Sequence, residues 1–137
     1  MAHQKFRVEV LTPDGEVFND EVEMVSTRTT VGSIGILANH EPVLAMLDPT
    51  ELRLYKTESE IVRFAQAEGY MQVADSRALI LVEEAHAPGE LDVAQLRERL
   101  QQAERDLEAA VDDTEKQRVA RRDIDRWEQF LRIADSG

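Results

Sequence analysis

The sequence contains no cysteine among its 137 residues. This absence excludes disulfide bridges, thiolate metal sites and cysteine nucleophiles, and it is compatible with a reducing compartment. No apolar run approaches the roughly 18 residues that a membrane span requires. The first residues pass almost directly into an alternating pattern, without the apolar core of a signal peptide. We therefore expect a soluble protein that stays in the compartment where it is made.

Basic residues are scarce relative to acidic ones. The chain has 16 Lys and Arg against 28 Asp and Glu, which gives a formal net charge of −12. Phosphates would be repelled by this charge, so the composition disfavours nucleic-acid binding and direct adhesion to anionic lipid. Hydrophobic residues make up 42% of the chain, which is enough for one domain, or for a small domain with an appendage.

Motifs that carry chemistry are also sparse. The three histidines, His3, His40 and His86, do not have the spacing of metal ligands, and no GxSxG nucleophile elbow is present. The glycines in residues 32–35 lack the Lys-Ser/Thr of a phosphate loop, so they indicate positive φ angles or close backbone approach. Paired carboxylates such as Glu83-Glu84 indicate a solvated face in so acidic a chain. We predict no catalytic residue and no metal site.

The first two thirds of the chain alternate between apolar and polar residues with the period of β-strands. Turn signals such as Pro13-Asp14-Gly15 interrupt this alternation. The predicted strands include residues 6–10, 21–24, 51–54, 61–66, 69–73 and 77–82. Short strands separated by frequent turns are typical of an antiparallel sandwich or barrel. Residues 78–82 are apolar on both faces, so we expect this strand to be central.

After Pro88-Gly89 the apolar residues recur at steps of three and four, as on one face of a helix. Two stripes are predicted: Leu96, Leu100, Ala103, Leu107 and Ala110, then Ala120, Ile124, Trp127, Leu131 and Ala134. Asp92 with Gln95 suits the start of the first helix, and Thr114 with Gln117 fits a capping box for the second. The pattern predicts a β-sandwich (residues 1–87), a linker (88–90) and an antiparallel two-helix hairpin (91–137).

The two predicted helices bury too little apolar surface on their own to offset the entropy of ordering them. We therefore expect the hairpin to lean on a second surface, either its own β-sandwich or a partner protein. A marginal element with two alternative docking surfaces is a common basis for a switch.

Arginines recur along the second predicted helix. Arg118, Arg122 and Arg126 are spaced by four residues and share one face, largely opposite the apolar stripe. Two interpretations remain open. The face is either solvated and neutralised by nearby acids, or it is a basic strip for an acidic partner or a nucleotide phosphate. Trp127 lies on the apolar stripe and is predicted to pack in the core.

Four stretches together resemble the epsilon subunit family of bacterial or plastid-type rotary F-type ATP synthases. They are EVLTPDGEVFNDEVEMV, VGSIGILANHEPVLAML, RALILVEEA, and the ELD that opens the helical part. The resemblance runs nearly end to end. It implies an all-β N-terminal sandwich of about ten short antiparallel strands and a C-terminal antiparallel two-helix hairpin, in agreement with the periodicity.

The resemblance also implies a role. Such a subunit has no catalytic residues of its own and belongs to the central stalk, bound to gamma and to the c-ring. It couples proton-driven rotation to ATP synthesis. The family's hairpin can extend along gamma and restrain ATP hydrolysis by meeting an acidic motif on the catalytic alpha/beta subunits. The implied location is peripheral, on the cytoplasmic face of a bacterial plasma membrane or the stromal face of a thylakoid.

The resemblance assigns three groups of residues. Gly32, Ser33, Gly35, His40 and Pro42 correspond to a loop that contacts the c-ring and gamma, and Arg118, Arg122 and Arg126 are candidates for the beta-subunit contact. ATP is implied as a regulatory ligand, and Leu91 and Asp92 match the family's nucleotide motif. Gln95 and Leu96 replace its arginine and alanine, which removes the natural phosphate partner and leaves Arg118 and Arg122 as substitutes. Glu68-Gly69 replaces a Gly-Gly pair, and we expect this to alter only a turn.

Two other functions remain open on the sequence alone. One is a stand-alone adaptor that docks through the hairpin as a coiled coil, and the other is an enzyme that uses His40. Binding to gamma discriminates the stalk subunit from both.

Overall fold

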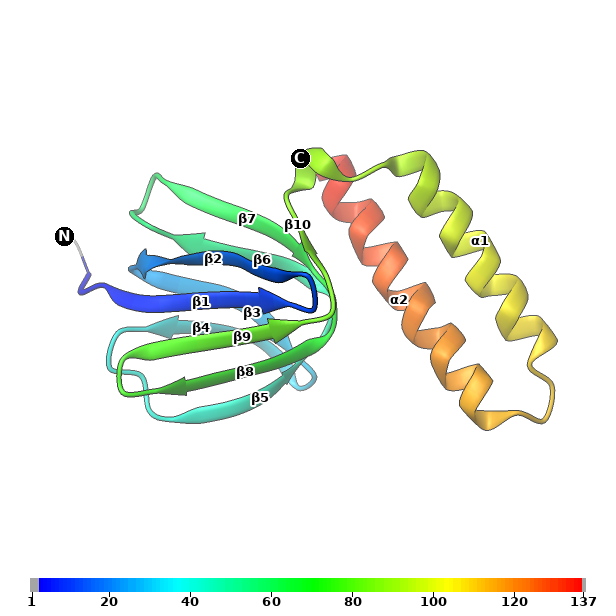
Figure 1. Ribbon diagram of the computed structural model, residues 1–137, viewed down its shortest axis with the longest axis horizontal. Helices are drawn as coiled ribbons and strands as arrows, with labels where there is room; N and C mark the ends of the chain where they lie inside the picture. The colour runs from blue at the N-terminus through cyan, green and yellow to red at the C-terminus, as the bar shows by residue number, and fades with distance from the viewer. Residues whose placement is uncertain (1–2, 137) are drawn as a thin grey trace.

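The computed structural model describes residues 3–136, which form a β-sandwich with a helical hairpin against one of its ends (Figure 1). The strands are β1 (Phe6–Thr12), β2 (Gly15–Val22), β3 (Met24–Thr29), β4 (Gly32–Leu37), β5 (Val43–Leu47), β6 (Thr50–Tyr55), β7 (Ile61–Gln66), β8 (Gly69–Ala74), β9 (Arg77–Val82) and β10 (Ala85–His86). A short 3-10 turn, Pro88–Glu90, leads to the helices α1 (Val93–Ala109) and α2 (Thr114–Ser136).

The strands follow the order β10-β7-β6-β3-β5-β8-β9-β1-β2, and β4 pairs with β3 outside this path. The predicted sandwich of about ten strands is confirmed. One pair departs from the antiparallel expectation, because β1 runs parallel to β9. The strand formed by residues 77–82 lies between β8 and β1, so its predicted central position is confirmed.

One face of each strand fills the sandwich core. Phe6, Val8 and Val10 alternate inward from β1, as the period-2 pattern predicts. They meet fully buried residues of the other strands, among them Val25, Ile36, Leu52, Leu54, Met71 and Ile80. Each such side chain contributes about 1.5–3 kcal/mol by leaving water. The sandwich therefore has a hydrophobic core that does not depend on the helices.

Two parts of the strand prediction are wrong. The expected strand at residues 21–24 is divided, because β2 ends at Val22 and β3 begins at Met24. Glu23 between them is buried, and its N–H donates to the carbonyl of Tyr55 at 2.7 Å. Because of this break, the inward-facing side chain at the start of β3 is Val25 and not Met24. The structure also forms β4 at residues that were predicted as a loop.

A second, smaller core joins the hairpin to the sandwich. It consists of Ala65 and Ala67 at the end of β7, and Leu96, Ala103, Trp127, Phe130 and Ile133 from the helices. The hairpin thus leans on its own sandwich, which is one of the two surfaces that we expected. Phe130 and Ile133 were not in the predicted stripe. They are buried because α2 packs on α1 along one side and on the sandwich along another.

The helix starts are fixed by aspartates. Asp92 caps α1, and its carboxylate accepts the Gln95 N–H at 3.1 Å, as predicted. The prediction for α2 is wrong by one residue: the carboxylate of Asp113 accepts the Lys116 N–H at 3.0 Å, and Thr114 is already helical. No helix within residues 3–136 is long and apolar enough to cross a membrane.

Candidate functional site

Arg126 of α2 lies at the contact between the hairpin and the sandwich. Its side chain is only 11% exposed. The guanidinium donates to Glu84 at 2.9 Å and, through two nitrogens, to Glu68. Glu68 follows β7 and Glu84 follows β9, so one arginine joins α2 to two separate segments of the sandwich.

The surroundings of Arg126 favour its charged form. Burial alone would lower its pKa, but the hydrogen bonds that it donates to Glu68 and the negative charges of Glu68, Glu84 and Asp123 outweigh burial and raise the pKa. The Trp127 ring lies beneath the guanidinium at 5.3 Å, and Arg99 of α1 lies 5.1 Å from the same ring. Both contacts are within the range of cation–π interactions. Arg126 is therefore a fixed positive charge with partners on three sides.

The expectation that the arginine face is opposite the packed side of α2 is wrong for Arg126. All three arginines line a cavity of about 450 Å³ between α2 and the sandwich, together with Met46, Tyr70 and Glu83. Arg118 is exposed and pairs with Glu115 at 2.6 Å. Arg122 pairs with Asp123 at 3.1 Å and lies 3.9 Å from Glu68. The sequence could not show this arrangement, because Glu68 is distant along the chain and was expected to affect only a turn.

The residues of the nucleotide motif do not meet their expected partners. Leu91 and Asp92 line a cavity of about 160 Å³, whereas Arg118 and Arg122 line the cavity next to Met46. The smaller cavity also carries Glu84 and Glu90, with Arg99 as its cation. Small-molecule sites usually have about 300–1,000 Å³, and carboxylates repel phosphate. The residues present do not fit ATP at this position.

The predicted contact loop is divided between the two ends of β4. Gly32 begins this strand with a φ of 135°, which confirms the expected special backbone there. The same expectation is wrong for Gly35. Its φ is not positive, and an added Cβ would meet nothing closer than the Met24 sulfur at 3.9 Å. Ser33 and Gly35 are exposed along β4, whereas His40 and Pro42 follow the strand.

The segment around His40 is held by hydrogen bonds at the end of the sandwich that lies away from the helices (Figure 1). Asn39, with a φ of 62°, donates to Gln4 at 3.0 Å and accepts from Ser76 at 3.1 Å. The ring of His40 lies 2.7 Å from the carbonyl of Glu41. Among residues 3–136, no group of three or more His, Asp or Glu side chains could hold a metal ion. The segment around His40 therefore presents a polar surface whose position is fixed by these hydrogen bonds.

A band of exposed apolar side chains crosses the outer face of four strands. Met46, Tyr70, Leu81 and Leu11 are neighbours in register from β5 through β8 and β9 to β1. The first three are 56%, 53% and 43% exposed, and Leu44 beside them is 74% exposed. Contiguous exposed apolar surface marks interaction sites in soluble proteins. The sequence signal was the doubly apolar strand 78–82, which we interpreted only as the mark of a central strand.

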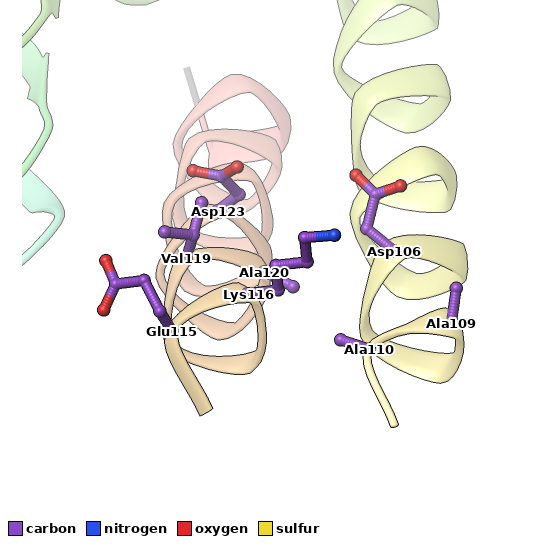
Figure 2. A pocket seen from close by; sticks show the side chains of 8 residues that line it. All are labelled: Asp106, Ala109, Ala110, Glu115, Lys116, Val119, Ala120 and Asp123. Atoms are coloured by element: carbon purple, nitrogen blue, oxygen red, sulfur yellow. The ribbon is translucent and has the colours of Figure 1, made fainter. Parts of the chain in front are cut away.

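A groove also lies between the end of α1 and the start of α2, with a volume of about 430 Å³ (Figure 2). Alanine and valine line its floor because these small side chains do not fill the space between the helices. Its rim carries Asp106, Glu115, Asp123 and Lys116, and Figure 2 shows Lys116 reaching from α2 toward α1. The groove is a consequence of the thin packing near the hairpin turn.

A family model and individual relatives both relate this sequence to the ATP synthase epsilon chains. A family model described as the ATP synthase, Delta/Epsilon chain, beta-sandwich domain matches residues 5–88. The ATP synthase epsilon chain of Priestia megaterium is 42% identical over 107 residues, which cover 77% of this chain and 78% of the relative. That of Rubrobacter xylanophilus is 33% identical over 130 residues, 91% of this chain and 88% of the relative.

Two solved structures share the fold. A chain in the OSCP, F1 and c-ring structure of the mitochondrial ATP synthase of Euglena gracilis superposes with a TM-score of 0.76 at 20% identity, covering 91% of this chain and 78% of that one. A chain in the central stalk and c-ring structure of the Tetrahymena thermophila enzyme gives a TM-score of 0.63 at 19% identity, covering 98% and 99%. Both likenesses include the sandwich and at least part of the hairpin.

Proposed function

Because this chain belongs to the family of ATP synthase epsilon chains, we propose that it is a rotor subunit of the central stalk. In this role it is a non-catalytic part of the enzyme. It transmits the proton-driven rotation of the c-ring toward the catalytic subunits, and its hairpin restrains ATP hydrolysis. It reaches the cytoplasmic face of the membrane only through the complex.

The observation that carries this proposal is the extent of the sequence likeness. The match to the Rubrobacter xylanophilus chain covers 91% of this chain, which is enough to include most of the helical hairpin as well as the sandwich. Of the two structural neighbours, one belongs to an F1/c-ring assembly and the other to a central stalk with its c-ring, which favours the same setting for this chain.

The apolar band supports gamma as a direct partner. Met46, Tyr70 and Leu81 expose a continuous row on a rigid sheet, and aromatic residues and methionine are enriched in protein interfaces. The band is flanked by the arginine cavity, so a stalk protein seated on it would lie close to the hairpin. We assign this face to gamma.

The far end of the sandwich suits contact with the c-ring. His40 and Pro42 lie in a short segment that is fixed on one side to Gln4 and on the other to Ser76, through Asn39. A surface that transmits torque must be stiff, and side-chain hydrogen bonds to two other segments provide that stiffness. Gly32 and Ser33 lie at the opposite end of β4, so they are not part of this surface.

Calorimetric titration of gamma with the full-length chain tests the assignment. We expect micromolar or tighter binding of the unmodified chain. Leu81→Glu places a charge in the apolar band and should weaken binding by about 30-fold, the equivalent of a 2 kcal/mol interface hot spot. Val111→Glu alters an equally apolar but more exposed residue at the hairpin turn and serves as the matched control.

Two results would contradict the proposal. The unmodified chain could show no binding to gamma at micromolar concentration, which would remove the stalk assignment. Alternatively, Leu81→Glu could bind as well as Val111→Glu, which would move the gamma surface away from the apolar band.

A further inference from the structure

We propose that Arg126 is a latch that holds the hairpin on the sandwich, and that docking depends on this internal ion pair instead of on a bound nucleotide. The latch goes beyond the proposed function, because it concerns two parts of one chain and not the proteins that this chain joins.

The apolar contact alone does not fix the position of the hairpin. On the sandwich side, the second core offers only Ala65 and Ala67. Alanine methyl groups present little shape for Phe130 and Ile133 to pack against, and the His86 ring of β10 adds one edge-on contact to Phe130, with the ring centroids 6.1 Å apart. Arg126 is the directional contact, since its fork of donors must meet Glu68 and Glu84 together. The ion pairs therefore set the position of α2 along the sandwich.

Burial makes the latch sensitive to the loss of one partner. The Arg126 side chain is 11% exposed, and those of Glu68 and Glu84 are 24% and 27% exposed. When one member of a largely buried pair is removed, the remaining charge stays in a poorly solvated position. Moving the hairpin away returns all three groups to water together, so loss of a single charge favours undocking.

The same geometry argues against nucleotide-dependent docking. The family's phosphate-binding arginine is Gln95 in this chain. Arg126 already has two carboxylate partners, and a phosphate would have to displace them while facing Glu84, Glu90 and Asp92 in the adjoining cavity. An acidic surface on a partner protein can instead receive Arg126 once α2 has left the sandwich. The latch and that partner then compete for one guanidinium.

The single tryptophan provides a direct readout of docking. Trp127 is 8% exposed and belongs to the second core, so undocking should shift its emission to longer wavelength and increase quenching by acrylamide. In the full-length chain, Arg126→Gln should produce both changes. Arg118→Gln is the matched control, because Arg118 pairs with Glu115 of its own helix, and its spectrum should equal that of the unmodified chain.

Arg126 also touches Trp127, so a second variant separates docking from a local effect on the ring. The double substitution Glu68→Gln with Glu84→Gln should reproduce the red shift, and adding Arg126→Gln to it should cause little further change. Millimolar ATP should leave the spectrum of the unmodified chain unchanged.

Two results would overturn the latch: glutamate variants that behave like Arg118→Gln, or a saturable change on addition of ATP. Circular dichroism verifies that each variant keeps its strands and helices. Gamma binding separates the two proposals, since an unmodified chain that fails to bind gamma contradicts the stalk assignment and leaves the latch standing.

Discussion

At the scale of single residues, two glycines that look alike in the sequence have opposite constraints. Gly69 begins β8, where an added Cβ would overlap the carbonyl oxygen of Leu81 and lie 2.7 Å from the Cα of Val82. These are backbone atoms of the paired strand β9, which cannot move without breaking the ladder. At Gly35 on β4 an added Cβ would make only ordinary contacts, with the Met24 sulfur at 3.9 Å and the Val25 carbonyl oxygen at 4.0 Å. Glycine is therefore required at only one of the two positions.

Gly69→Ala should destabilise the protein by about 1–3 kcal/mol, the usual cost of forcing extra atoms into packed structure. Gly35→Ala should remain within about 0.5 kcal/mol of the unmodified chain. Urea denaturation followed by circular dichroism measures both free energies of unfolding. Equal stability of the two variants would show that β8 and β9 can separate at Gly69.

Residue roles could be predicted from the sequence where they follow from local chemistry. The turn chemistry of Gly32 and the capping aspartate of α1 are local, and both are confirmed. The role of Arg126 depends on Glu68, 58 positions away in the sequence. Spacing along α2 placed Arg126 correctly among three arginines but could not show that it alone donates hydrogen bonds to both Glu68 and Glu84, whereas Arg122 only approaches Glu68 at 3.9 Å.

At the scale of elements, the connection between the helices is held by polar contacts. Asp113 caps α2, and the Gln117 side chain donates to the carbonyl of Ala110 at 2.8 Å, across the turn. The carbonyl at the end of α1 and an N–H at the start of α2 are thereby satisfied. The hairpin turn is consequently defined by Asp113 and Gln117, with Thr114 inside the helix.

Substitutions at Asp113 and Thr114 test which of the two residues caps α2. Asp113→Ala should cost about 1 kcal/mol of stability, as the loss of an N-cap does. Thr114→Ala should be neutral or slightly stabilising, because alanine has the higher helix propensity. Thermal unfolding monitored at 222 nm provides the comparison. A larger loss for Thr114→Ala would restore the capping box that the sequence indicated.

Element boundaries could be predicted where alternation and turn chemistry agree. The strands at residues 61–66 and 77–82 have the predicted bounds. β4 was missed because Gly32, Ser33 and Gly35 weaken its alternation, and the strand is defined by pairing with β3. The exposure of the outer face of β9 was not predicted, because a buried face and an exposed interface leave the same apolar pattern in a sequence.

At the scale of the whole molecule, the two cores are separate in composition. The sandwich core draws all of its members from the first 85 residues, and the second core adds the helices to the end of β7. The apolar band that we assign to gamma belongs to the sandwich, and the proposed restraint on hydrolysis belongs to the hairpin. Binding and regulation are therefore assigned to parts that can be removed independently.

Removal of residues 90–137 should leave gamma binding within about twofold, since the apolar band and the sandwich core stay intact. ATP hydrolysis by the assembled enzyme should rise, because the restraining element is absent. Calorimetry and a steady-state ATPase assay, in both latent and activated enzyme, measure the two effects. Unchanged hydrolysis in both states would show that the hairpin does not inhibit.

The parallel pairing of β1 with β9 has a consequence for biosynthesis. Arg7 pairs with Arg77, so the first strand to leave the ribosome cannot complete its ladder until almost the whole sandwich has been translated. Closing so long a loop has a substantial entropic cost and slows folding. The apolar face of β1 is meanwhile shielded only by its hairpin with β2. A nascent chain that pauses before β9 is therefore the form most in need of a chaperone.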